Sequence, residues 1–147
     1  MFGLFKKKAK GFTLSLLELP SDGFCAVAGE SHYQEALRAT KLICSEAFEG
    51  RPAFTAALVP ERDNKYDDNA IAVYSPQGKL GYLPRERASE YRELFDILVR
   101  RGYHGGGCAA HLTGGERGKF YGVVLRLADP DACLDELDVS DRGAREG

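Results

Sequence analysis

The sequence has no long hydrophobic run. A membrane-spanning helix needs about 20 consecutive apolar residues, and no segment approaches that length, so no membrane partner is expected. The lysines at positions 6–8 are followed by Ala9, Lys10 and Gly11 rather than by an apolar core, so no secretory leader is expected. N-myristoylation is excluded because residue 2 is phenylalanine.

Metal-binding spacings of cysteine and histidine are also missing. No two cysteines stand at a C-x-x-C spacing, and the three histidines show no spacing typical of metal ligands. These residues are Cys25, Cys44, Cys108 and Cys133, and His32, His104 and His111. We therefore expect reduced cysteines, no cofactor and a cytoplasmic protein.

A strongly basic composition is missing too. The formal net charge is −2, but residues 1–11 carry +4, residues 129–147 carry −5 and the segment 12–128 between them carries −1. Nucleic-acid binding, if present, must therefore come from a local site or from the N-terminal lysines. We expect a flexible basic tail over 1–11, one folded domain over 12–128 and a disordered acidic tail over 129–147.

Short apolar segments separated by turn residues predict a small, curved, mostly antiparallel β-barrel of the α+β class, with two helices. The expected strands are 12–19, 24–28, 52–59, 70–74, 79–83, 105–113 and 119–127. Gly114–Gly118 lacks the fingerprint of a phosphate-binding loop, so we expect a plain hairpin loop there.

Both predicted helices have start signals. Ser31 and Gln34 stand at the spacing of a capping box, so a helix should begin near His32 and end by about 44–49. Its inward face should carry Ala36, Leu37 and Thr40. The second helix should run from Pro84 to Arg101, because apolar residues recur there at three- and four-residue steps and Gly102 is a good stop.

The most informative stretch is 58–84, where a polar loop over 60–69 separates two apolar runs. This many hydrogen-bonding groups predicts a loop that binds something or holds a particular shape. Asn64, Asp67 and Asn69 are common loop formers that bond their own backbone, so both interpretations stay open on spacing alone. A divalent ion held by Glu61, Asp63, Asp67 and Asp68 is a further alternative, although the alternating ligands and central glycine of a calcium loop are absent.

Three segments together resemble the HIRAN domain. They are AGESHYQ at 28–34, LVPERDNKYDDNAIAV at 58–73 and GYLPRERA at 81–88. This module occurs at the N-terminus of some helicase-like DNA-repair proteins and as a standalone protein in bacteria and phages. The resemblance covers about 24–127 and implies a small OB-like or SH3-like barrel.

In eukaryotic members the resemblance further implies a pocket for the 3′ end of single-stranded DNA. The Tyr-Asp pair at the terminal nucleotide matches Tyr66 and Asp67, the aspartate accepting a hydrogen bond from the 3′-hydroxyl. The other matching positions are Asn64 in the same loop, Ser31 and His32 for base stacking, Arg85 for phosphate, and Tyr82 near the nucleotide.

The chain departs from that pattern at Ser31-His32, where eukaryotic members carry arginine and tyrosine. Histidine stacks more weakly and serine does not stack, so lower DNA affinity is expected, and Ser31 has an alternative role as a helix cap. Each other position also has a structural alternative: Tyr66 packing over the barrel end, Tyr82 as an ordinary strand residue, and Arg85 paired with Glu86 or solvent.

We therefore expect a nucleic-acid-binding module without catalysis. Its expected partner is the 3′ end of single-stranded DNA, or damaged or stalled DNA, and candidate protein partners are a helicase, a nuclease or another repair protein. We expect a monomer. The first alternative is a protein–protein adaptor, and the second is a metal-dependent hydrolase acting on nucleic acid, for which no nucleophile–base pairing is visible.

Overall fold

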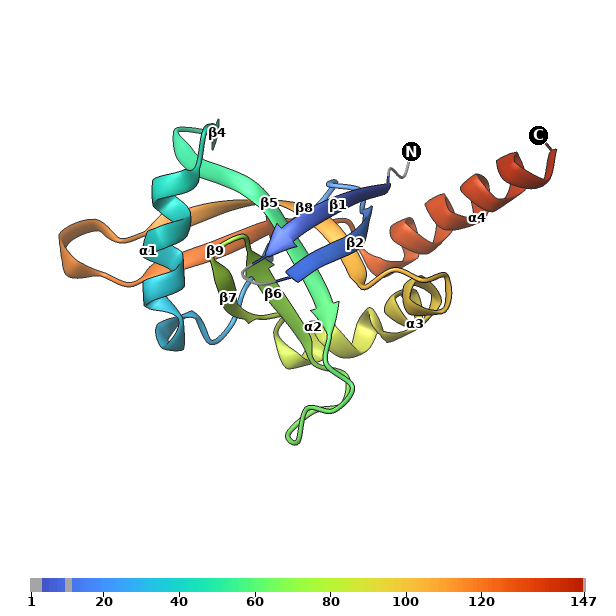
Figure 1. Cartoon of the computed structure of the whole chain (residues 1–147), viewed down its shortest axis with the longest axis horizontal. Coiled ribbons are helices and arrows are strands. Elements are labelled where there is room, and N and C mark those ends of the chain that lie inside the picture. The colour runs from blue at the N-terminus through green and yellow to red at the C-terminus, as the bar shows by residue number, and fades with distance from the viewer. Residues whose placement is uncertain (1–3, 10–11, 147) are drawn as a thin grey trace.

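The computed structural model describes the backbone of residues 4–9 and 12–146 (Figure 1). Its strands are β1 (Leu4–Ala9), β2 (Phe12–Glu18), β3 (Cys25–Ala26), β4 (Glu46–Phe48), β5 (Arg51–Pro60), β6 (Ile71–Ser75), β7 (Gly78–Tyr82), β8 (Gly105–Gly114) and β9 (Tyr121–Arg126). Its helices are α1 (Gln34–Ile43), α2 (Arg85–Glu90), α3 (Arg92–Arg100) and α4 (Pro130–Glu146), with short 3-10 turns η1 (Glu30–His32) and η2 (Glu116–Gly118).

The strands follow one another around a barrel. Antiparallel pairing connects β9, β8, β5, β6 and β7 in that order, and β3 pairs with the outer edge of β9. Just after β3, Ala28 exchanges two backbone hydrogen bonds with Tyr82 of β7, at 2.8 and 2.9 Å. This bridge closes the ring. The β1–β2 hairpin extends the sheet through a parallel pairing of β2 with β8.

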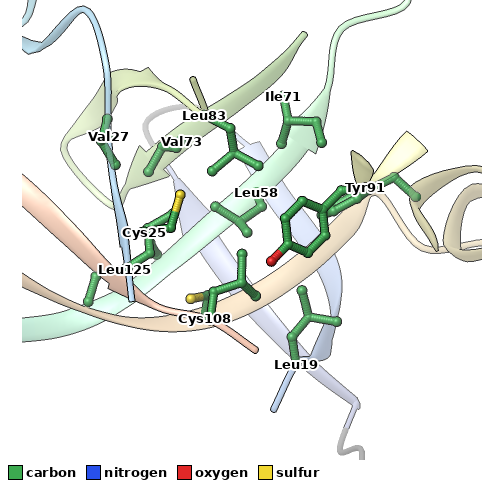
Figure 2. Packing of buried hydrophobic residues seen from close by; sticks show 14 of the residues in the cluster. Leu19, Cys25, Val27, Leu58, Ile71, Val73, Leu83, Tyr91, Cys108 and Leu125 are labelled. Carbon is green, nitrogen blue, oxygen red and sulfur yellow. The ribbon is translucent and has the colours of Figure 1, made fainter. Parts of the chain in front are cut away.

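One apolar core fills the barrel and continues under the helices. Figure 2 shows the ring of Tyr91 pointing into this core beside residues such as Leu58 and Ile71. Tyr91 is fully buried, and its hydroxyl donates a 2.6 Å hydrogen bond to the carbonyl oxygen of Ala128. The predicted inward face of α1 is confirmed at Leu37 and Thr40, which are fully buried, while Ala36 is only partly buried against the core.

The predicted α+β barrel is confirmed, but the expected number of helices is wrong. The helix expected over 84–101 divides into α2 and α3 at Tyr91, whose backbone adopts φ −91° and ψ 0°. The bend lets the Tyr91 side chain enter the core and reach Ala128. Alternating polarity and helical periodicity do not encode such a contact, because the partner lies 37 residues away.

Both tails also differ from expectation where the structure describes them. Leu4–Ala9 of the expected flexible tail pairs along its length with β2, while residues 1–3 and 10–11 lie outside the described residues. The expected disordered acidic tail contains α4, which buries Cys133 and Leu137 against the core. These two residues are four positions apart and so share one face of the helix. Their burial stabilises a segment whose acidic composition by itself favours disorder.

The expected capping box at Ser31 is wrong. Ser31 lies in the turn η1, and α1 begins after Tyr33 without a side-chain cap. Gln34 bonds instead to the backbone of Tyr121 on β9, donating to its oxygen at 3.0 Å and accepting from its nitrogen at 2.8 Å. The glutamine thus ties α1 to the barrel wall.

None of the described helices has the length and hydrophobicity that a membrane span requires.

Candidate nucleic-acid interface

The loop between β5 and β6 extends from the barrel beside α2 (Figure 1). Its base is closed where the backbone nitrogen of Glu61 donates to the oxygen of Ala70 at 2.8 Å. Its centre is organised by Asn64, whose Oδ1 accepts hydrogen bonds from the backbone nitrogens of Tyr66 at 2.9 Å and Asp67 at 3.1 Å. Asn64 therefore shapes the loop from within, as asparagine commonly does in turns.

On one side the loop is held to β7 by a charged network. Glu61 accepts hydrogen bonds from Lys79 Nζ at 2.7 Å, the Tyr82 hydroxyl at 3.0 Å and Asn64 Nδ2 at 3.1 Å. Lys79 Nζ also donates to the Tyr82 hydroxyl at 2.9 Å and lies 4.9 Å from the centroid of its ring. The network is mostly buried, with 20% of the Glu61 side chain and 25% of the Lys79 side chain exposed.

The pKa values of this network follow from its contacts. Burial by itself would raise the pKa of Glu61, but the hydrogen bonds from Lys79, Asn64 and Tyr82 outweigh it and bring the pKa below its usual value. Burial would lower the pKa of Lys79, yet its bonds to Glu61 and Tyr82 raise the pKa above the usual range. Both groups therefore stay charged at neutral pH.

On the other side the loop is held to α3. Arg62 donates to the carbonyl oxygen of Asp68 at 3.1 Å and pairs with Asp96 at 2.6 Å. Arg92 donates to the side chain of Asn69 at 2.5 Å and pairs with the same Asp96 at 3.2 Å. The loop thus has side-chain contacts with both β7 and α3.

A surface cavity of about 650 Å³ opens between this loop and α2. It is lined by Asn64, Lys65, Tyr66, Asp67, Asp68, Asn69, Arg85, Glu86 and Ser89. Tyr66, one of these lining residues, is 87% exposed. Arg85 donates to the carbonyl oxygen of Tyr66 at 2.7 Å, and its Nε lies 3.8 Å from Asp67 Oδ2.

The two oxygens of Asp67 differ. Oδ1 accepts a 2.9 Å hydrogen bond from the backbone nitrogen of Asn69, which completes the turn. Within the described residues Oδ2 accepts no hydrogen bond and has only the longer ion pair with Arg85. The cavity thus combines an exposed aromatic ring, an acceptor oxygen without a hydrogen-bond donor and a mostly exposed guanidinium.

Comparison with known families identifies the segment that contains this cavity. The family model of the HIRAN domain matches residues 52–101. Residues 52–101 therefore belong to a HIRAN domain. The matched residues run from β5 through α3, so they include the loop, the β6–β7 hairpin and the start of α2. No curated protein and no solved structure matches the chain.

The domain assignment indicates a nucleic-acid-binding module. It covers five of the seven site residues expected from sequence: Asn64, Tyr66, Asp67, Tyr82 and Arg85. Ser31 and His32 lie before the matched segment, so they depend only on the resemblance of residues 28–34.

Four of the expected HIRAN site residues line one cavity: Asn64, Tyr66, Asp67 and Arg85. Tyr82 does not line it, but its hydroxyl reaches the loop through Glu61. Ser31 and His32 are exposed in the turn η1, which lies against β7 and β9 rather than against the cavity. The structure therefore separates the residues expected to stack on bases into a pair at η1 and a tyrosine that lines the cavity.

Sequence analysis missed the residues that support the HIRAN loop. They are Lys79, Arg92 and Asp96, and it considered Glu61 only as an acidic ligand. A signal existed for one pair, because Arg92 and Asp96 stand four residues apart on one helix and can pair along its surface. The contacts of Lys79 and Asp96 with the loop depend on tertiary structure and leave no local pattern.

The carboxylates considered for a divalent ion are not gathered together. Across the part of the chain that the structure describes, no group of three histidine, cysteine, aspartate or glutamate side chains is placed to hold a metal. Glu61 is paired with Lys79, and Asp67 is bonded within its own turn. Two of the four acids that the sequence offered for a divalent ion are therefore engaged in contacts within the protein.

Proposed function

We propose that the loop cavity of this HIRAN domain binds the 3′ end of single-stranded DNA, and that the protein acts by binding rather than by catalysis. The observation that carries the proposal is the acceptor Asp67 Oδ2, which lies 3.8 Å from Arg85 Nε in a cavity that the exposed Tyr66 also lines. Binding of this kind fits a role at damaged or stalled DNA, beside a helicase, nuclease or other repair protein.

Asp67 would select the chemistry of the strand end. A free 3′-hydroxyl can donate a hydrogen bond to Oδ2, whereas the 3′ oxygen of an internal nucleotide carries no proton to donate. A 3′-phosphate would bring negative charge against the carboxylate. A single acceptor therefore favours one end group and opposes the other.

Tyr66 and Arg85 would hold the rest of the terminal nucleotide. Stacking of a base on an aromatic ring contributes about 1–3 kcal/mol, and the exposed face of Tyr66 is available for it. The Arg85 side chain is 74% exposed, so it can bind a phosphate while keeping its bond to the Tyr66 carbonyl.

Fluorescence anisotropy with three short DNAs tests the proposal. The DNAs are a single strand with a 3′-hydroxyl, the same strand with a 3′-phosphate, and a duplex. We expect selective binding of the 3′-hydroxyl strand that weakens as salt rises. Asp67→Ala should weaken it by about 10- to 150-fold, because a hydrogen bond to a charged group contributes about 1.5–3 kcal/mol.

Asp63→Ala is the matched control, since Asp63 is an exposed acid of the same loop that does not line the cavity. It should leave the preference for the 3′-hydroxyl unchanged. Equal binding of both strand ends would reduce Asp67 to a turn former in a site without end preference. Failure to bind any of the three DNAs would reject the proposal and favour the protein-adaptor alternative.

A further inference from the structure

Glu61 has no place among the groups that would contact DNA, yet it connects the loop to the barrel. Its Oε1 accepts from Asn64 Nδ2 at 3.1 Å and from the Tyr82 hydroxyl at 3.0 Å, and its Oε2 accepts from Lys79 Nζ at 2.7 Å. Two of these donors belong to β7, whose Tyr82 also forms the bridge that closes the barrel. A direct chain of hydrogen bonds therefore leads from the barrel wall to Asn64.

We propose that Glu61 is a positioning residue that fixes the orientation of the Asn64 amide and thereby the direction of Tyr66 and Asp67. The inference rests on the 3′-end site proposed above. An ionised carboxylate only accepts hydrogen bonds, so the group of Asn64 that faces Glu61 must be its NH₂. The oxygen Oδ1 then faces the backbone nitrogens of Tyr66 and Asp67, which can only donate.

Only a carboxylate at position 61 satisfies all three of its donors. The ammonium of Lys79 cannot accept a hydrogen bond, so one oxygen must always face it. In a Glu61→Gln variant the remaining group would be an NH₂ facing the NH₂ of Asn64. If Asn64 turned over to accept this bond, its NH₂ would face the two backbone N–H groups and the turn would open.

Reversing the polarity of the pair tests this inference. Glu61→Gln places a donor where the acceptor was, and Asn64→Asp places an acceptor where the donor was. Each single variant should disturb the loop, because it sets two donors or two carboxylates against each other. The double variant E61Q/N64D should restore it, since the new glutamine can donate to the new aspartate, which still accepts from both backbone nitrogens. Glu90→Gln is the control, because it removes a carboxylate whose ion pair is with Arg87 of the same helix rather than with Asn64 or its donors.

Two measurements follow the variants. Amide hydrogen exchange at Tyr66 and Asp67 in the DNA-free protein should speed up by about threefold or more in Glu61→Gln, the size of a typical lost hydrogen bond. The preference for a 3′-hydroxyl over a 3′-phosphate strand should fall in parallel. Both should recover in the double variant and remain unchanged in Glu90→Gln. A purely structural role for Glu61 would lower the melting temperature without recovery by the reversed pair.

The outcomes separate this inference from the proposed function. Unchanged exchange in Glu61→Gln, or a double variant no better than the single variants, would overturn the positioning role. If the wild-type protein shows no preference for the 3′-hydroxyl, the proposed function fails, while the exchange measurement still decides whether Glu61 orients Asn64.

Discussion

Replacing Gly81 by alanine should open the barrel at its closing bridge. Gly81 has φ +151° and precedes Tyr82, which exchanges two backbone hydrogen bonds with Ala28. A Cβ at position 81 would lie 2.5 Å from the carbonyl oxygen of Ala28 and 2.7 Å from Val27 Cγ1. The first of these atoms is a backbone acceptor of the bridge itself, so the collision cannot be relieved by turning a side chain.

The size of the effect follows from the interactions that the alanine would break. Two backbone hydrogen bonds contribute about 1–3 kcal/mol together, and overpacking costs about 1–3 kcal/mol more. Gly81→Ala should therefore lower the free energy of unfolding by about 2–6 kcal/mol beyond the backbone strain. Typical domains have about 5–15 kcal/mol in total, so the variant should be severely destabilised.

Gly102→Ala separates the collision from the strain. Gly102 also has a positive φ, +92°, but apart from its chain neighbours no described residue has a heavy atom within 4 Å of the position that a Cβ would occupy there. Urea unfolding of both variants should show the extra loss only in Gly81→Ala, and amide exchange should accelerate at Ala28 and Tyr82. If the two variants differed by less than about 0.5 kcal/mol, the bridge would not be what closes the barrel.

Two further predictions concern the core and the response to pH. Tyr91→Phe should lower the free energy of unfolding by about 1–3 kcal/mol, because it leaves the buried carbonyl of Ala128 with only the weak, 3.7 Å contact from Cys133 Sγ. In urea unfolding, Tyr66→Phe at an exposed position should change nothing, and an equal effect of both variants would contradict the argument. Burial and two neighbouring arginines lower the pKa of His111 from 6.5. Just below pH 6.5 the imidazole is therefore more often protonated in the unfolded chain than in the folded protein. Stability should therefore fall as the pH drops below 6.5, by at most about 1.4 kcal/mol per pH unit, and a thermal-melt series should show less of this fall in His111→Phe.

The strands of the barrel were predictable because their signals are local. Apolar segments bounded by glycine and proline located β5, β6, β7 and β8 to within one or two residues. The polar loop over 60–69 stood out for the same reason, since it interrupts two apolar runs. The four residues that share the cavity were named from a resemblance and not from geometry, because no local pattern shows where a loop points.

The elements that sequence analysis missed depend on distant partners. α4 begins at Pro130 directly after Asp129, a pair typical of a helix start, but the many acids of this segment favoured disorder. What stabilises the helix is burial of Cys133 and Leu137 against a core assembled from the rest of the chain. Gln34 likewise does not form the expected capping box, because its side-chain amide bonds to both the backbone nitrogen and the backbone oxygen of Tyr121 on β9.

The structure also changes the choice between loop former and ligand group. For Asn64 the loop-forming role is visible, since both ends of its amide are used within the protein. For Asp67 the two roles belong to different oxygens: Oδ1 closes the turn to Asn69, while Oδ2 faces Arg85 at 3.8 Å without a hydrogen-bond donor among the described residues.

A turn that needs only one carboxylate oxygen would be served as well by asparagine, which is the common alternative in such turns. What asparagine lacks is a second oxygen to accept from a ligand. Asp67→Asn should therefore keep the turn and lose the preference for a 3′-hydroxyl, and a variant that kept that preference would assign Asp67 to the turn alone.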